Sequence, residues 1–211
     1  MIDIAMISDT HLAHEDGDID VPEARVLIHA GDCTKMGTAK ELIKFNTWFS
    51  SLPHKTKILV AGNHDFLFQK DLGHALSLLD PSITYLQDSG VVVAGLTIYG
   101  SPWQPWFYNW AFNLYRGDAI REKWDLIPNG IDVLVTHGPP KGVLDKTTSG
   151  EYVGCDDLMS AISTRVSPKL HVFGHIHEAH GVVSKYGTTF VNAAIVDEHY
   201  IIKHKAEVLC I

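Results

Sequence analysis

Cysteine and long apolar runs are scarce in this sequence of 211 residues, and each scarcity excludes a class of protein. The three cysteines, Cys33, Cys155 and Cys210, lack C-x-x-C spacing, so neither a disulfide framework nor a thiolate zinc site is predicted. This cysteine usage favours a reducing cytoplasm as the location. Apolar runs such as Val91 to Ala94 are far shorter than the roughly 18 residues of a membrane helix, so we expect no membrane partner.

Positive charge is also in short supply. The chain has 17 lysines and arginines against 25 aspartates and glutamates, which gives a formal net charge of −8. Proteins that grip long nucleic acid neutralise its phosphates with a basic stripe. We therefore expect no long nucleic acid among the partners, and any attraction for a phosphate group must be local.

Hydrophobic residues make up 45% of the chain, which is ample for a single core at this length. No repeat, low-complexity tract or linker interrupts the sequence, so we predict one domain over residues 1–211 and leave its oligomeric state open. The oddity of the composition is its thirteen histidines, several of which stand beside Gly, Asp or Asn. Histidine is the commonest metal ligand, so these positions matter most.

Short apolar runs recur along the chain, each followed by Gly, Asp or His, and they are typical of buried strands. The runs are Ile2 to Ser8, Val26 to Ala30, Ile58 to Ala61, Val133 to Thr136 and Leu170 to Phe173. The C-terminal part differs, because it reads as short strands joined by tight turns, which favours antiparallel pairing. These strands are Gly181 to Lys185, Thr188 to Ala193, Tyr200 to Lys203 and Ala206 to Ile211.

Helical patterns lie between the apolar runs. Thr38 and Glu41 have capping-box spacing, and the periodicity after them predicts a helix from about Thr38 to Ser51. A second helix begins near Asp156 and ends before Pro168, and the segment around Asp71 to Leu79 is a candidate third. Strands that alternate with helices predict the α/β class.

Five motifs place polar residues immediately beyond a predicted strand. They are Asp9-Thr10-His11, Gly31-Asp32, Gly62-Asn63-His64-Asp65, Thr136-His137-Gly138 and Gly174-His175-Ile176-His177. Because the carboxyl ends of parallel strands meet at one edge of a sheet, we expect these residues to converge there. The candidate metal ligands are Asp9, His11, Asp32, Asn63, His137, His175 and His177.

This ligand set exceeds the three or four that one catalytic cation takes from protein, which suggests two divalent metal ions that share a carboxylate. Asp32 is the natural bridge. Mixed nitrogen and oxygen donors without thiolate suit Mn, Fe or Zn better than Ca or Mg. Two such cations against two aspartates and a hydroxide leave roughly one positive charge, which favours a phosphoryl group as substrate.

The ordered motifs D-x-H, G-D, G-N-H-D, T-H-G and G-H-x-H resemble the calcineurin-like metallophosphoesterase superfamily over residues 9 to 177. Longer stretches are similar to the subgroup of metallophosphoesterase-domain-containing proteins known from vertebrate brain and bacteria. These are Leu27 to Asp32, Gly100 to Trp106, Thr136 to Pro140 and Gly174 to Glu178. The resemblance implies an α/β fold in which a two-sheet β-sandwich is flanked by α-helices, with a dinuclear metal site at the carboxyl ends of strands.

Carried onto this sequence, the resemblance implies a ligand set for each metal. The first metal would be held by Asp9, His11, Asp32 and His177, and the second by Asp32, Asn63, His137 and His175. A metal-bridging hydroxide would then attack phosphorus in line. His64, oriented by Asp65, would protonate the departing alkoxide or contact the phosphate.

The subgroup is associated with cyclic nucleotide phosphodiesterase activity, so the resemblance implies a small phosphodiester or nucleotide as the substrate. Two alternatives stay open. One is a phosphomonoesterase that acts on nucleotides or phosphoproteins, and the other is a regulatory protein that binds metal or nucleotide without turnover. No substrate-binding residue can be assigned from the sequence.

Other conspicuous residues have simpler readings. His29 and His171 lie inside predicted strands and are expected in the core, whereas His14 and His180 lie close enough to motifs to support a ligand from behind. Cys155 is expected to be a structural thiol. The aromatic segment from Trp103 to Trp110 could stack on a nucleobase, but segments of this kind more often pack over a sheet.

Overall fold

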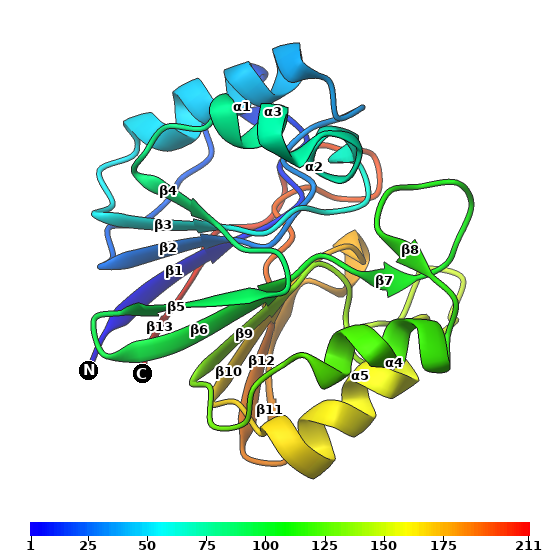
Figure 1. Ribbon diagram of the computed structural model, residues 1–211. Coiled ribbons are helices and arrows are strands. Elements are labelled where there is room, and N and C mark those ends of the chain that lie inside the picture. Colours follow the sequence, from blue (N-terminus) through cyan, green and yellow to red (C-terminus); the bar gives the residue numbers. More distant parts are fainter.

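Two β-sheets pack face to face and carry helices on their outer sides (Figure 1). The computed structural model of the chain describes all residues from 1 to 211. The first sheet has the strand order β13 (Glu207–Cys210), β1 (Asp3–Ile7), β2 (Val26–His29), β3 (Thr56–Leu59) and β4 (Ile83–Tyr85). The two-sheet sandwich that the resemblance implied is thus confirmed.

The second sheet is built largely from the other half of the chain. Its order is β11 (Gly181–Lys185), β12 (Thr188–Asn192), β10 (Leu170–Phe173), β9 (Val133–Thr136), β6 (Leu96–Ser101) and β5 (Ser89–Val93). A small ribbon of β7 (Gln104–Pro105) and β8 (Asn113–Leu114) stands beside it. The hairpin of β5 and β6 was not among the predicted strands.

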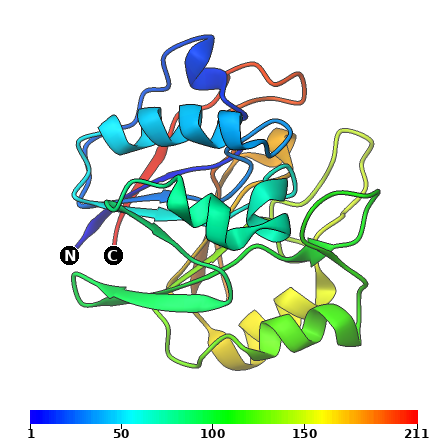
Figure 2. The same cartoon turned by 45° about the horizontal axis from the view of Figure 1, so that its top comes forward.

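The central strands of both sheets run parallel, and antiparallel strands lie at the edges. Strands β1 to β4 pair in parallel, as do β12, β10, β9 and β6. The edge strands β13, β11 and β5 each pair antiparallel, so the antiparallel pairing expected near the C-terminus is confirmed. Because β13 pairs with β1, the two chain termini lie side by side (Figures 1 and 2).

Each central strand is buried on both faces, which explains its uninterrupted apolar sequence. In β1, Ile4 and Met6 point into the layer between the two sheets, where Val133 and Val172 meet them from the other side. Ala5 belongs to the opposite layer, under the helices of the first sheet. A third apolar layer lies between the second sheet and its own helices.

Three helices cover the first sheet and two cover the second (Figure 1). Over the first sheet lie α1 (Ala39–Ser51), α2 (Phe66–Lys70) and α3 (Leu72–Ser77). Over the second lie α4 (Asp118–Asp125) and α5 (Asp156–Ala161), which continues as a π-helical turn, Ile162–Val166. Short 3-10 helices follow the first and last motifs, at Ala13–Glu15 and His177–Ala179. None of the helices combines the length and the apolar character that a membrane crossing requires.

Each of the predicted helices is present in the structure. Thr38 caps α1 in a full capping box with Glu41, as its spacing predicted. The candidate helix around Asp71 to Leu79 is present as α3, Leu72–Ser77, and it begins where the Asp71 side chain caps it. Asp71 has a φ of −150°, which separates α3 from the short helix α2 before it. Helix α4 was not predicted.

One predicted strand is wrong. Tyr200 to Lys203 forms a loop with a single isolated bridge, between Val196 and Ile202. The Asp197 carboxylate accepts hydrogen bonds from the backbone N–H groups of His199 and Ile201, which favours a turn over extended pairing.

Candidate metal centre

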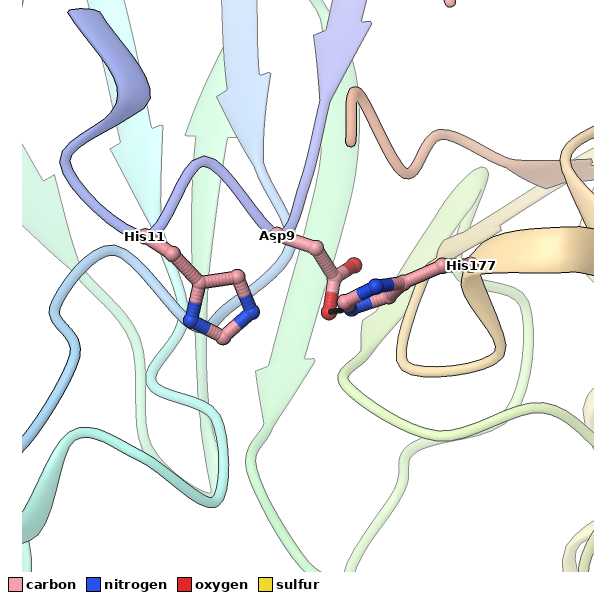
Figure 3. Close-up of side chains that lie close together, drawn as sticks. All are labelled: Asp9, His11 and His177. Atoms are coloured by element: carbon pink, nitrogen blue, oxygen red, sulfur yellow. Dashed lines mark ion pairs between the residues drawn. The ribbon is translucent and has the colours of Figure 1, made fainter. Parts of the chain in front are cut away.

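The polar residues of the five motifs meet where the carboxyl ends of the two sheets adjoin. Asp9, Asp32 and Asn63 come from the ends of β1, β2 and β3, and are at most 2% exposed. The histidines of the last two motifs come from the ends of β9 and β10 in the other sheet. Figure 3 shows the Asp9 carboxylate directed at the ring of His177, with His11 beside them.

These side chains form three overlapping groups of potential metal ligands. The groups are Asp9, His11 and His177; His11, Asp32 and His64; and Asp32, His137 and His175. Within each group the ligand atoms lie within 4.8 Å of one another. Asn63 joins the third group, because its Oδ1 lies 2.9 Å from Nε2 of His137. All seven predicted ligands are therefore brought together, and Asp32 lies in two groups.

Two buried ligand atoms have no hydrogen-bond partner in the protein. They are Oδ1 of Asp9, which lies 3.3 Å from Nε2 of His177, and Nε2 of His11. Burying a polar atom without a partner is costly, and the cost is greatest for a charged group. The orphaned atoms face one another across a space lined by oxygen and nitrogen donors, so the residues present fit a divalent cation.

Backbone carbonyls hold the ligating rings from behind. The Nδ1 atom of His11 lies 3.2 Å from the Thr34 carbonyl oxygen, and Nδ1 of His137 lies 3.0 Å from that of Ala30. In the same way, Nδ1 of His177 lies 2.9 Å from the carbonyl oxygen of Asp197. A carbonyl can only accept, so each Nδ1 carries a proton and each Nε2 is turned towards the site.

The backbone at the motifs adopts conformations that strand and helix do not use. Asp9, His11, Asp32 and His175 have φ angles of 52°, 40°, 55° and 70°, in the left-handed region that non-glycine residues seldom adopt. Such conformations cost free energy and concentrate at functional sites. Gly174 lies so close to the Asp9 carboxylate that a Cβ atom there would clash with it.

Burial and charge pairing set the protonation of the ligands. Burial lowers the pKa of His11 to about 4 and that of His175 to about 3, which keeps both rings neutral and able to ligate. Burial also acts to lower the pKa of His137 and His177, but the neighbouring carboxylates of Asp32 and Asp9 hold both at about 9. A cation at these rings replaces that proton, because only the neutral ring binds metal.

His64 is held differently from the sequence-based expectation. Its Nδ1 lies 2.5 Å from the carbonyl oxygen of Lys35, and no protein group bonds its Nε2. The carboxylate of Asp65 instead accepts from the backbone N–H groups of Gly62 and Thr34, at 2.8 and 2.9 Å. The expectation that Asp65 orients the His64 ring is therefore corrected: Asp65 ties two motif loops together, and burial raises its pKa.

A cavity lies on each side of the ligand cluster. The larger, of about 400 Å³, reaches His175 and is walled by Trp106, Phe107 and Pro139, with Arg116 at its edge. The smaller, of about 280 Å³, is lined by His11, Lys35, His64 and Tyr200. Lys35 and Tyr200 were missed by sequence reasoning, because neither follows a strand or belongs to a motif.

The aromatic segment packs over the sheet in one part and borders the larger cavity in another. Trp103 packs beneath the surface, with its indole N–H donating to Asp88 at 2.8 Å. Trp106 is half exposed beside the larger cavity, and Phe107 lies with its ring centre 5.0 Å from that of His175. Trp110 packs on His64, at 4.1 Å between ring centres.

The remaining residues singled out in the sequence are structural. His29 and His171 are fully buried, as expected. His14 stacks on Trp48, and His180 stacks on His204 and pairs with Glu207, so neither supports a ligand ring from behind. Cys155 is buried and accepts from the Leu158 N–H at the start of α5, and burial raises the pKa of its thiol.

Two sheets with His and Asp side chains converging at their carboxyl ends define a metallophosphoesterase fold. Residues 2–179 match the calcineurin-like phosphoesterase family, and the chain belongs to that family. It is 46% identical over 217 residues to human Metallophosphoesterase domain-containing protein 1, covering 92% of this chain and 66% of that protein. It is also 42% identical over 204 residues to UPF0046 protein K07C11.7 of Caenorhabditis elegans, covering 90% and 69%.

The chain thus spans about two thirds of the length of these relatives. A solved structure, TT1561 of Thermus thermophilus, superposes with a TM-score of 0.61 over 99% of this chain and 98% of that one. Sequence identity to it is 14%, so this likeness supports the fold alone.

Proposed function

We propose that the chain is a phosphodiesterase that works with two divalent metal ions, which we expect to be Mn, Fe or Zn. The observation that carries the proposal is the set of three overlapping ligand groups. His11 links the first group to the second, and Asp32 links the second to the third. In the proposed arrangement one cation is held by Asp9, His11, Asp32 and His177, and the other by Asp32, Asn63, His137 and His175. Bound there, the cations would neutralise phosphoryl oxygens and lower the pKa of water.

His64 is the proposed general acid. The carbonyl of Lys35 holds the Nδ1 side of the ring, which leaves Nε2 to give a proton to the departing alkoxide. The His64 backbone N–H donates to Oδ1 of Asp32 at 2.8 Å, so the acid is tied to the proposed bridging ligand. The role proposed for Asp65 is to position this loop rather than to move a proton.

The two cavities favour a diester over a monoester. In-line displacement places the leaving group opposite the attacking oxygen, and a diester carries a second organic group as well. The cavities beside His64 and His175 can receive these two groups. At the larger cavity the Arg116 guanidinium is already bonded to the carbonyls of Val153 and Gly154, so this cavity offers no free cation to a monoester dianion.

A cyclic nucleotide is the substrate that we propose within this class. Trp106 and Phe107 give the larger cavity an aromatic wall of the kind on which bases stack, and its volume of about 400 Å³ lies within the range for small-molecule sites. The free thiols fit a reducing compartment, and we place the enzyme in the cytoplasm, without long nucleic acid or membrane as partner.

Side-by-side assays with bis-para-nitrophenyl phosphate, para-nitrophenyl phosphate and a panel of cyclic nucleotides test the proposal. We expect the diesters to be preferred, activity to vanish after chelation, and Mn to restore it. A clear preference for the monoester would make the chain a phosphomonoesterase. Stoichiometric metal binding without turnover of any phosphoester would identify a regulatory binding protein.

A further inference from the structure

The smaller cavity beside the metal centre holds residues to which no role has yet been given. Four residues line it: His11 and His64 on the side of the ligands, and Lys35 and Tyr200 on the side of solvent. His11 also belongs to two of the ligand groups, and its buried Nε2 has no hydrogen-bond partner. The cavity therefore borders the candidate metal centre.

Lys35 contributes to this cavity through both its backbone carbonyl and its side chain. Its carbonyl fixes the His64 ring, and its ammonium group is the permanent positive charge in the lining. The ammonium has one weak partner, Asp16, at 3.9 Å, and the two side chains are 52% and 78% exposed. Exposed pairs of this kind contribute little, so an anion in the cavity can replace Asp16.

Tyr200 forms the opposite wall. It has a φ of 62° and lies at the turn whose Asp197 carbonyl holds His177. Its ring stands edge-on to His11, at 4.8 Å between ring centres, and to His177, at 5.6 Å. The side chain is half exposed, so one part of the ring packs on the ligand histidines while the rest is open to a group in the cavity.

We propose that Lys35 and Tyr200 form the subsite for the leaving group, and that the preferred leaving alcohol carries both an aromatic ring and an anionic substituent. This inference rests on the proposed phosphodiesterase function and concerns acyclic diesters, whose leaving alcohol departs as a separate molecule; in a cyclic nucleotide the leaving oxygen stays on the same sugar. The general acid must lie on the side of the departing oxygen, and His64 lines this cavity and not the larger one. Tyr200 supplies a stacking surface, and Lys35 supplies the charge that selects an anion.

The reaction balances as a hydrolysis. The oxygen of water bonds to phosphorus, the bond from phosphorus to the leaving oxygen breaks, and that oxygen takes a proton from His64. Of the two protons of the attacking water, one is released to solvent and the other returns His64 to its starting state. No oxidant, reductant or further reactant is required.

Two aryl diesters that differ only in one carboxylate on the leaving ring test the proposal. The ratio of their kcat/KM values, compared between wild type and Lys35→Gln, cancels their intrinsic reactivity. We expect the substitution to lower the preference for the carboxylate-bearing diester roughly 3- to 10-fold, as befits a charge-assisted contact at a half-exposed site. Lys55→Gln is the matched control, because Lys55 is exposed and precedes β3, at the end of the sheet away from the ligands.

A second diester series, in which a phosphate replaces the carboxylate, distinguishes the two anion types. Tyr200→Leu should lower kcat/KM for both diesters by the same factor and leave the ratio of the two values unchanged. Calorimetric binding of the released carboxyphenol gives a readout that does not depend on turnover, and Lys35→Gln should weaken it by the same factor.

The outcomes separate the two proposals. If wild type hydrolyses neither diester, the proposed function fails. If wild type hydrolyses both, but Lys35→Gln changes their rates equally or leaves carboxyphenol binding intact, then the leaving-group subsite is refuted while the phosphodiesterase stands.

Discussion

The two sheets contribute different chemistry to the metal centre. The first sheet provides every candidate oxygen ligand, namely Asp9, Asp32 and Asn63, together with His11. The second provides imidazoles alone, His137, His175 and His177. The group of Asp9, His11 and His177 and the group of Asp32, His137 and His175 each combine residues of both sheets. Cations bound there would join the sheets, so metal binding and sheet packing should stabilise each other.

Behind the candidate ligands, both sheets contain a similar hydrogen bond between a buried histidine and a threonine. A buried histidine bonds the threonine next to a ligand in each: His29 lies 2.9 Å from Thr10, and His171 lies 2.8 Å from Thr136. In the first sheet the other ring nitrogen accepts from the Gly31 N–H, whereas Nδ1 of His171 has no partner. The His29 ring is thus more fully hydrogen-bonded than the His171 ring.

The largest expected effect comes from breaking the link that Asp32 forms between the clusters. Asp32→Asn should empty one or both metal positions, because a neutral amide bridges two cations poorly. Elemental analysis after gel filtration measures the loss, and hydrolysis should fall with it. Asp20→Asn, at an exposed position, is the control. Unchanged metal content in the Asp32 variant would remove Asp32 from its role.

The second largest effect should come from removing the proposed general acid, His64, which follows strand β3 of the first sheet. His64→Ala should keep its metals and lose on the order of 10²-fold in turnover, as expected for a missing general acid. Metal analysis and steady-state rates on the same sample separate the two effects. Wild-type rates would mean that His64 is structural, and lost metal would make it a ligand.

The two buried histidines should both make the stability of the fold depend on pH. Burial lowers the pKa of both His29 and His171 to about 3, whereas an unfolded histidine titrates near 6.5. The unfolded chain therefore binds more protons between pH 6.5 and 3, and folding stability falls as the pH drops through that window. Each histidine should contribute at most about 1.4 kcal/mol per pH unit.

Urea unfolding of His29→Gln and His171→Gln across that window tests both parts of the comparison. Either substitution should flatten the acid dependence relative to wild type. At neutral pH His29→Gln should be the more destabilising, by about 1–3 kcal/mol, because it leaves the buried Gly31 N–H without its hydrogen-bond acceptor. Equal losses at neutral pH would show that the extra bond in the first sheet contributes nothing.

The smallest effect concerns the helices over the two sheets. Helix α1 begins with a capping box at Thr38, whereas α5 begins with the thiol of Cys155, a weaker acceptor. Thr38→Ala should cost about 1 kcal/mol in thermal unfolding. Cys155→Ala should cost less through the cap itself, and a larger loss there would point to packing of the buried thiol instead.

The sequence predicted most of the strands well because buried strands depend on local pattern, and the candidate ligands that it named are brought together by the fold. Strands β9, β10 and β11 match their predicted ranges, since a run buried on both faces is apolar throughout. Elements whose signal is mixed were missed. Helix α4 has a polar face and strand β5 is half exposed, so periodicity did not distinguish either from a loop.

By itself, the sequence determined which residues could hold a metal, because oxygen and nitrogen donors of Asp, Asn and His recur directly after strands that carry them to the sheet edge. Only the tertiary structure decided how those residues are supported. The carbonyl of Lys35 behind His64, the ties made by Asp65 and the wall formed by Tyr200 all join segments remote in sequence. Backbone carbonyls are common to every residue, so no pattern of side chains indicates which of them will face a given ring.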